Sequence, residues 1–281
     1  HFDCGFEILM ASNIPAGGGI SSSSALECGF AYAVSETFGF GIDRITIAKL
    51  GQMSEHKFMN VNCGIMDQFI IAMGKKNTAI VLDCNTLEYE YAPLELGDYR
   101  FVVMNTNKQR RLADSKYNER RSQCEQALAL LKESGLKINA LCELTPEEWE
   151  ASKAAVKDEI LQKRAKHCIY ENARVLAAVK ALNGGDLKKL GALLNESHES
   201  LKTDYEVTGI ELDTLAETAQ KQEGCLGARM TGAGFGGCGI ALVHKDNIDS
   251  FVKNVQDTYT KTIGYNAGFF ACESGDGVAK M

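Results

Sequence analysis

The chain has 281 residues, of which 45% are hydrophobic and 24% charged, an ordinary balance for a globular protein that argues against a disordered tail or a fibre. Thirty basic against 37 acidic side chains give a net charge of −7, which repels a phosphate backbone, so general nucleic-acid binding is not expected. No apolar run approaches the ~20 residues of a membrane helix. The length predicts one large or two moderate domains.

A Gly/Ser-rich loop between a strand and a helix is the main feature of the first hundred residues. Residues 5–12 are mixed apolar and predict a strand, and the string NIPAGGGISSSSALE follows. Ser24 and Glu27 have the spacing of a capping box, so we expect Ser24 to be the N-cap of a helix that ends at Gly39. The next pattern predicts a helix from Asp43 to about Phe58 and then strands over 78–84, 87–92 and 100–106.

Helical spacing dominates the rest of the chain. Pro146 follows Thr145 at an expected helix start. The predicted helices cover 119–133, 157–182, 186–201, 211–223 and 246–260, and two strands flank the last of them, one after the Gly-rich ARMTGAGFGGC and one over 268–272. Strands and helices interleave without a regular βαβ order, and the composition shifts near residue 97. We therefore predict an α+β fold with domains over 1–97 and 98–281.

Cysteine is frequent, but its spacing does not indicate a metal site. The ten cysteines contain no C-x-x-C pair, and the five histidines are scattered along the chain. Several cysteines lie inside apolar strings, among them Cys84 and Cys238. We expect buried, reduced thiols in a cytoplasmic protein.

Basic residues cluster at 108–111, 120–121 and 163–166. Acidic residues interleave with them and no row of aromatic residues accompanies them, so we expect solvated helix faces and no nucleic-acid site. Trp149 and a leucine stripe are expected to belong to the core; the stripe comprises Leu187, Leu190, Leu194 and Leu201.

The Gly/Ser loop has the chemistry of a polyphosphate cradle. Its glycines let backbone N–H groups approach an anion, a helix N-terminus adds unpaired donors, and the serine hydroxyls can bind phosphate oxygens or Mg²⁺. A flexible loop capped by one serine explains the same residues, and both interpretations stay open on physical grounds. The loop is not a Walker-type P-loop, because no lysine follows its glycines.

A second Gly-rich loop covers residues 232–237. Gly234, Gly236 and Gly239 match G-x-G-x-x-G, but a dinucleotide site needs a helix after the glycines, and here a strand is expected. A tight turn between two strands is the plain alternative.

Four strings together resemble one enzyme family. PAGGGISSSSAL and ARMTGAGFGGC are similar to the second and third motifs of the GHMP small-molecule kinases, and CGIMDQFI and SHESLKTDYEVTGIELD narrow the resemblance to the galactokinases. The resemblance implies a ribosomal S5-like first domain, here truncated, and a ferredoxin-like second domain with the site between them. The implied reaction is ATP + D-galactose → ADP + α-D-galactose 1-phosphate, with Mg²⁺.

The resemblance also assigns site residues. ATP would be held by Gly17, Gly18, Gly19, Ser21, Ser22 and Ser23; Mg²⁺ by Ser23 and Glu55; and the sugar by Gly64, Asp67, Tyr117, Gly232 and Gly234. Asp67 would be the catalytic base. An aspartate with an ordinary pKa of about 3.9 is a weak base, so we expect late proton transfer, with positioning and charge neutralisation doing most of the stabilising.

Three of these residues also have a purely structural explanation. Glu55 could be a solvated helix carboxylate, Asp67 an N-cap before the apolar FIIAM run, and Tyr117 a half-exposed residue at a helix start. Ala233 stands where the family often has glycine, which is tolerable unless its φ is positive.

The largest departure from the family lies at the front of the chain. The N-terminal galactokinase signature, with its Arg, Glu-His pair and Asp, has no counterpart, and the chain starts at His1. We therefore expect the true start to lie upstream and this chain alone to be inactive. Alternatives to a galactokinase are an N-acetylgalactosamine kinase, a non-catalytic galactose/ATP sensor and a non-catalytic scaffold. We expect small-molecule substrates, no nucleic acid or membrane partner, and a monomer or weak dimer.

Overall fold

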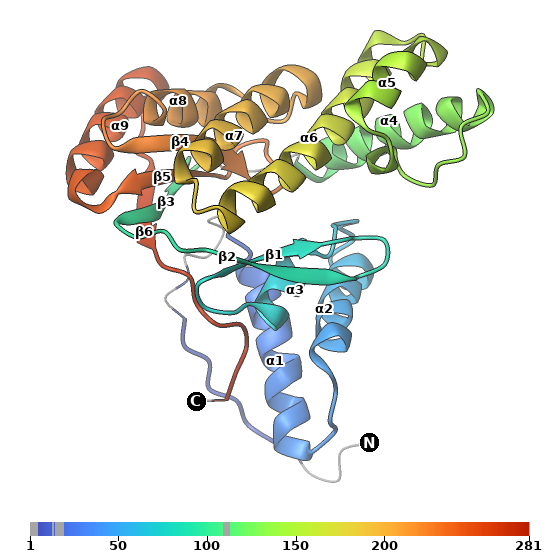
Figure 1. The fold of residues 1–281 in the computed structure, drawn as a ribbon. Coiled ribbons are helices and arrows are strands. Elements are labelled where there is room, and N and C mark those ends of the chain that lie inside the picture. The colour runs from blue at the N-terminus through green and yellow to red at the C-terminus, as the bar shows by residue number, and fades with distance from the viewer. Residues whose placement is uncertain (1–4, 13, 15–19, 109–112, 281) are drawn as a thin grey trace.

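A computed structural model describes residues 5–12, 14, 20–108 and 113–280, and Figure 1 shows the arrangement of its elements. The helices are α1 (Ser22–Phe38), α2 (Arg44–Phe58), α3 (Met66–Met73), α4 (Ala113–Glu133), α5 (Pro146–Ser152), α6 (Glu159–Asn183), α7 (Leu187–Ser200), α8 (Ile210–Ala219) and α9 (Ile248–Ile263). The strands are β1 (Thr78–Leu82), β2 (Tyr89–Pro93), β3 (Tyr99–Asn105), β4 (Cys225–Thr231), β5 (Cys238–His244) and β6 (Gly268–Cys272).

A four-stranded antiparallel sheet forms the core of the second half. Its strand order is β4-β5-β3-β6. When these four strands are numbered in the order in which they occur along the chain, this is the strand order of a ferredoxin-like sheet. Helices α8 and α9 pack on the sheet through one apolar cluster that includes Val102, Leu215, Phe251 and Tyr259. The Tyr259 hydroxyl donates to the Thr106 carbonyl at 2.7 Å. The α+β class and the ferredoxin-like second half are confirmed.

The first half places three helices against a small hairpin. Strands β1 and β2 pair antiparallel, and their side chains pack on α3 around Phe69 and Tyr89, whose rings lie 5.4 Å apart. The C-terminal tail returns to this half, since the Gly277 N–H donates to the Gly74 carbonyl and the Val278 N–H to the Ile71 carbonyl, each at 2.8 Å (Figure 1). Nothing in the sequence pattern indicated this return.

Two local predictions near the N-terminus are wrong. Residues 5–12 form no strand, and Leu9 is 97% exposed there. The N-cap of α1 is Ser21 in a left-handed conformation, so the helix begins at Ser22 and Ser24 lies buried within its first turn. The capping-box spacing failed because Glu27 turns toward α2, where tertiary contacts decide its position. Helix α4 also begins at Ala113, six residues before its predicted start at 119.

Other sequence signals were accurate. Asp43 caps α2 by accepting from the Thr46 N–H at 2.9 Å, and Thr145 and Glu148 form a capping box at α5. Trp149 is buried in the α4–α5–α6 core, as expected. Only two of the described cysteines are buried, which corrects the expectation of buried thiols; Cys28 and Cys238 are buried, whereas Cys84 and Cys142 are exposed.

The expectation of solvated basic faces is wrong at two positions. Arg120 is 8% exposed and Arg164 is 2% exposed, while their neighbours Arg121 and Lys163 are exposed. Both buried guanidinium groups are occupied by hydrogen bonds to residues 204–206. The clusters at 120–121 and 163–166 therefore each contain one arginine that faces the core.

His167 gives the fold a pH dependence. Its ring is buried on α6, stacks on Tyr205 with 4.4 Å between ring centroids, and its Nδ1 lies 3.0 Å from the Ser200 hydroxyl. Burial lowers the pKa of His167 to about 4, against the opposing charge of Glu171. An unfolded histidine titrates near 6.5, so as the pH falls the unfolded chain binds a proton that the folded protein excludes. Stability is therefore full above about pH 6.5 and is lost toward pH 4.

We expect this histidine to remove about 2 kcal/mol of unfolding free energy between pH 7 and pH 5. Urea unfolding at the two pH values measures the loss, and His167→Gln should reduce it. Ser200→Ala is the comparison, because it removes the hydroxyl partner but keeps the titrating ring, so it should lower stability by a similar amount at both pH values. An unchanged pH slope in His167→Gln would contradict the assignment.

Candidate active site

The segment that carries CGIMD is held by α2. The Gln52 Nε2 and the His56 Nε2 both donate to the Cys63 carbonyl, at 3.2 and 2.9 Å, and the Val61 N–H donates to the Glu55 carbonyl at 3.1 Å. This anchored loop leads directly into α3. Asp67 is the second residue of α3, where the helix dipole favours a negative charge. The N-cap position belongs to Ile65, so the expected capping role of Asp67 is wrong.

Gly64, Asp67 and Tyr117 lie together, although Tyr117 comes from α4 and the other two from the α2–α3 connection. Burial raises the pKa of the Tyr117 phenol, and the neighbouring Cys63 and Asp67 add to the shift, while a hydrogen bond from the Gly64 backbone opposes it. Tyr117 is half-buried. Its phenol therefore stays protonated at neutral pH and can donate a hydrogen bond beside the Asp67 carboxylate.

Three carboxylates act electrostatically on the Cys63 thiol. Burial raises the pKa of this thiol, and the charges of Glu55, Asp67 and Glu27 raise it further, so all three acids lie near it. Glu55 is 9% exposed, which overturns the interpretation of a solvated helix carboxylate. Carboxylates on three helices, α1, α2 and α3, thus act electrostatically on one thiol.

Glu27 is the acidic residue that sequence reasoning did not assign to the site. Burial raises the pKa of its carboxyl group, and the charge of Glu55 adds to the shift. Its Oε2 atom and the Oε1 atom of Gln68 are buried, and neither has a hydrogen-bond partner among the described residues. The spacing of four between Ser23 and Glu27 on one helix could have indicated it, because such residues share a helix face.

This donor set fits a hard divalent cation. Mg²⁺ is bound in proteins by one or two carboxylates, and substrate phosphates and water supply the remaining ligands. Glu55 is buried beside Glu27, whose carboxyl group is hydrogen-bonded to Ser54 and Gln68 but whose buried Oε2 atom has no hydrogen-bond partner among the described residues. Within the described ranges, no group of three or more His, Cys, Asp and Glu side chains forms a complete protein-only metal site.

The serine run lies at the start of α1. Gly17, Gly18 and Gly19 fall outside the described residues. Ser21 has a φ of 59° and makes no side-chain cap, so the first amides of α1 are not covered by it. Ser22 and Ser23 border a mainly apolar hollow of about 700 Å³.

The second Gly-rich loop is a turn between β4 and β5. Gly232 and Gly234 both have a positive φ, of 76° and 81°, whereas Ala233 does not, so alanine is tolerated there. A Cβ on Gly234 would lie 2.3 Å from the Val207 carbonyl oxygen. A strand follows the loop, as expected, so the G-x-G-x-x-G match lacks the helix that a dinucleotide fingerprint requires.

A membrane-spanning helix is absent from the described part of the chain.

Comparison with known proteins agrees with this geometry. The model of the GHMP kinases N terminal domain matches residues 1–75, and that of the GHMP kinases C terminal domain matches residues 178–261. The structure also resembles Leishmania major mevalonate kinase, with a TM-score of 0.59 at 17% identity, which supports the fold alone. The fold is that of a GHMP kinase.

Relatives of higher sequence identity show which family of GHMP kinases the chain belongs to. The chain is 54% identical over 277 residues to the galactokinase of Clostridium beijerinckii, covering 99% of this chain and 71% of the relative. It is 51% identical to a crystal structure of Lactococcus lactis galactokinase complexed with galactose, with a TM-score of 0.91 over 95% of this chain and 69% of the other. The chain belongs to the galactokinase family of the GHMP kinases.

Proposed function

We propose that the protein is a galactokinase that transfers the γ-phosphoryl group of ATP to the C1 hydroxyl of D-galactose, giving α-D-galactose 1-phosphate. The observation that carries the proposal is the convergence of Gly64, Asp67 and Tyr117 in a chain that is 51% identical to a galactose-bound galactokinase. The test is ADP release with galactose by the full-length gene product, with the sugar phosphate identified by ³¹P NMR. No galactose-dependent ADP release would overturn the proposal.

Each site residue has its own role in the proposed reaction. Asp67 accepts a hydrogen bond from the C1 hydroxyl, orients its oxygen toward the γ-phosphorus and takes the proton late, because a loose phosphoryl transition state needs positioning more than a strong base. The protonated Tyr117 phenol donates to a sugar hydroxyl. Gly17–Gly19 and Ser21–Ser23 hold the ATP phosphates, while Gly232 and Gly234 border the substrate.

The proposal includes Mg²⁺, with Ser23 and Glu55 as its protein ligands. The orphaned Glu27 oxygen beside Glu55 supports a cation here. When bound, the ion would neutralise charge on the phosphate oxygens. Glu55 would hold its position from α2, and the Ser23 hydroxyl would supply a ligand from α1.

Glu55→Gln should raise the Mg²⁺ concentration needed for half-maximal rate by roughly tenfold or more, because a neutral amide is a weaker ligand for a hard cation. The measurement is an Mg²⁺ titration of initial rate at saturating ATP and galactose. Binding of Mn²⁺ followed by its paramagnetic resonance spectrum gives a readout that is independent of turnover. Glu36→Gln, an exposed carboxylate on α1, is the matched control. Unchanged metal dependence would remove Glu55 from the site.

Sugar selectivity is tested side by side with galactose and N-acetylgalactosamine. A preference for the N-acetylated sugar would replace the proposed substrate. Binding of both ligands without ADP release would indicate a sensor, and absence of nucleotide binding by calorimetry a scaffold.

The remaining assignments stay proposals. We propose a domain division near residue 97, which is supported by the gap between Pro93, where β2 ends, and Tyr99, where β3 begins. We propose a cytoplasmic location, supported by the free, exposed thiols of Cys84 and Cys142. A monomer or weak dimer is expected from sedimentation of the full-length protein.

A further inference from the structure

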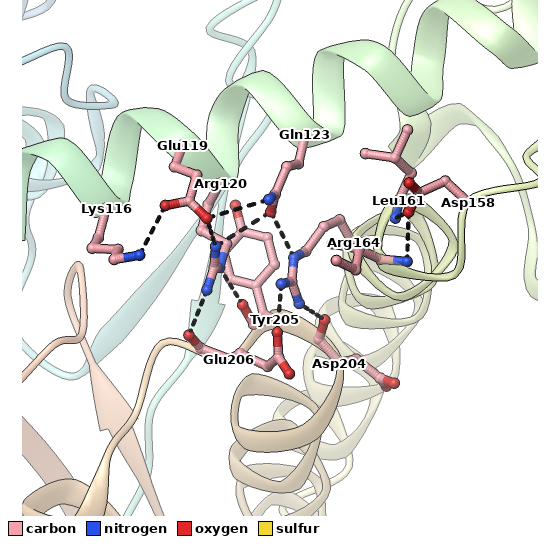
Figure 2. Close-up of polar contacts among 11 residues, drawn as sticks. Lys116, Glu119, Arg120, Gln123, Asp158, Leu161, Arg164, Asp204, Tyr205 and Glu206 are labelled. Carbon is pink, nitrogen blue, oxygen red and sulfur yellow. Dashed lines mark hydrogen bonds and ion pairs between the residues drawn. The ribbon is translucent and has the colours of Figure 1, made fainter.

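Two buried arginines hold three successive backbone carbonyls. On α4, the Arg120 Nε donates to the Tyr205 carbonyl at 2.7 Å and its Nη2 to the Glu206 carbonyl at 3.1 Å. On α6, the Arg164 Nη1 donates to the Asp204 carbonyl at 2.6 Å. Figure 2 shows the two guanidinium groups converging on this turn from neighbouring helices. We call residues Arg120, Arg164 and Gln123 the arginine clamp.

The clamp is a closed hydrogen-bonded unit. The Gln123 Oε1 accepts from Arg164 Nε at 2.8 Å and from Arg120 Nη1 at 3.3 Å, so one amide joins both arginines. Each buried cation also has a carboxylate partner, Glu119 at 2.9 Å for Arg120 and Glu206 at 2.5 Å for Arg164 (Figure 2). The two positive guanidinium groups can therefore lie side by side, because each is paired with a carboxylate and hydrogen-bonded.

The clamped turn needs hydrogen-bond donors from other elements. Residues Leu201–Tyr205 form a π-helical turn after α7, and the last carbonyls of a helix have no partners within it. Glu206 then adopts a left-handed conformation with a φ of 56°, which a non-glycine residue rarely adopts. The guanidinium donors satisfy the orphaned carbonyls and fix this change of direction.

Val207 connects the clamped turn to the second Gly-rich loop. The buried Val207 accepts from the Phe235 N–H at 2.7 Å, and its carbonyl oxygen lies so close to Gly234 that a Cβ there would be 2.3 Å away. The position of Val207 therefore sets the position of the loop at 232–237. Arg120 is three residues after Tyr117 on α4, hence on the same helix face, and the Tyr117 phenol acts electrostatically on Tyr205.

We propose that Arg120 and Arg164 are positioning residues that set the placement of the Gly232–Gly237 loop relative to Tyr117. The path runs from α4 and α6 through the carbonyls of residues 204–206 to Val207 and then to Gly234. The functional part of the inference rests on the proposed function, since Tyr117 and the loop are there placed on the galactose side of the site. Loss of the clamp lets the loop shift, and small misplacements of substrate-positioning groups cost much rate.

Arg120→Lys tests the proposal in the full-length protein. Lysine keeps the charge but lacks the planar fork that reaches two carbonyls at once. We expect kcat/KM for galactose to fall about 10- to 100-fold, through a raised KM and a lowered kcat, while KM for ATP stays within about twofold. We also expect faster amide hydrogen exchange at Phe235.

Arg121→Lys is the matched control. It makes the same change one residue along α4, where the side chain pairs with Glu125 and both are more than half exposed, at 57% and 63%. We expect wild-type kinetics and wild-type exchange at Phe235. If Arg120→Lys fails to fold, Glu206→Gln serves instead, because it removes the charge partner of Arg164 at a more exposed position and should move both readouts in the same direction.

The two hypotheses can fail separately. A folded Arg120→Lys protein with wild-type KM, kcat and Phe235 exchange overturns the clamp proposal, as does a KM change for ATP alone. Wild-type protein that never phosphorylates galactose overturns the proposed function. In that case the exchange rate at Phe235 still decides whether the clamp holds the loop.

Discussion

Asp67→Ala is expected to lower kcat by roughly 10³-fold or more while ATP and galactose still bind. The carboxylate is the group proposed to orient the C1 hydroxyl and accept its proton, and general-base and positioning contributions of this kind are worth several orders of magnitude. Asp67 lies in the first turn of α3, and the loop before it is held by Gln52 and His56 through the Cys63 carbonyl, so this loop should keep its place when the Asp67 side chain is shortened. Steady-state kinetics measure kcat, and calorimetry measures binding of each substrate.

Asp249→Ala is the matched control for this change. Asp249 is the acidic residue in the first turn of α9, as Asp67 is in α3, and it is exposed. Both variants lose a favourable charge at a helix N-terminus, worth about 0.3–1 kcal/mol of stability, but only Asp67→Ala should lose activity. Near-normal kcat in Asp67→Ala would remove this residue from its proposed role. Asp67→Asn, which keeps the shape but not the charge, should stay close to the alanine variant.

Local signals in the sequence predicted those elements whose ends are set by their own residues. Asp43 and Thr145 cap the helices that they were expected to cap, because a cap needs only contacts within one turn. The resemblance to a family, and not periodicity, supplied the ferredoxin-like order of β4-β5-β3-β6, which depends on pairing between distant strands.

Tertiary contacts set the burial and the partners of the residues that were misassigned from the sequence. Arg120 and Arg121 are adjacent and chemically alike, yet the first is buried against residues 205 and 206 and the second is at the surface. Glu27 has the spacing of a capping box with Ser24, yet its carboxylate lies near Glu55 of another helix. The identity of a charged residue does not reveal its partner when the partner is tens of residues away.

The sequence motifs assigned residues to the candidate site, but they did not indicate the contacts that support those residues. The motif strings pointed to Gly64, Asp67 and Tyr117, and the structure brings these three together. It adds Gln52 and His56, which anchor the Cys63 carbonyl and so set the direction from which α3 starts. Such supporting contacts carry no motif, because any donor of suitable length on the facing helix can make them.

Among glycine-to-alanine substitutions in the site, Gly234→Ala should lower stability and activity the most. The residue has a φ of 81°, where alanine is strained, and the added Cβ would lie 2.3 Å from the Val207 carbonyl oxygen, which is backbone and cannot rotate away. We expect a loss of at least about 2 kcal/mol in the free energy of unfolding, from left-handed strain and steric displacement together. Urea unfolding measures it. We also expect kcat/KM for galactose to fall roughly 100-fold, because the loop must move away from Val207.

Gly264→Ala separates the two causes of this loss. Gly264 ends α9 with a φ of 93°, and no heavy atom of the described residues lies within 4 Å of the Cβ that alanine would add. It should therefore show the cost of left-handed backbone alone, about 1 kcal/mol, with unchanged kinetics. If Gly234→Ala is no less stable than Gly264→Ala, the Val207 carbonyl does not hold the loop. If it is less stable but fully active, the loop at 232–237 takes no part in binding galactose, since a displaced loop could not leave the sugar site intact.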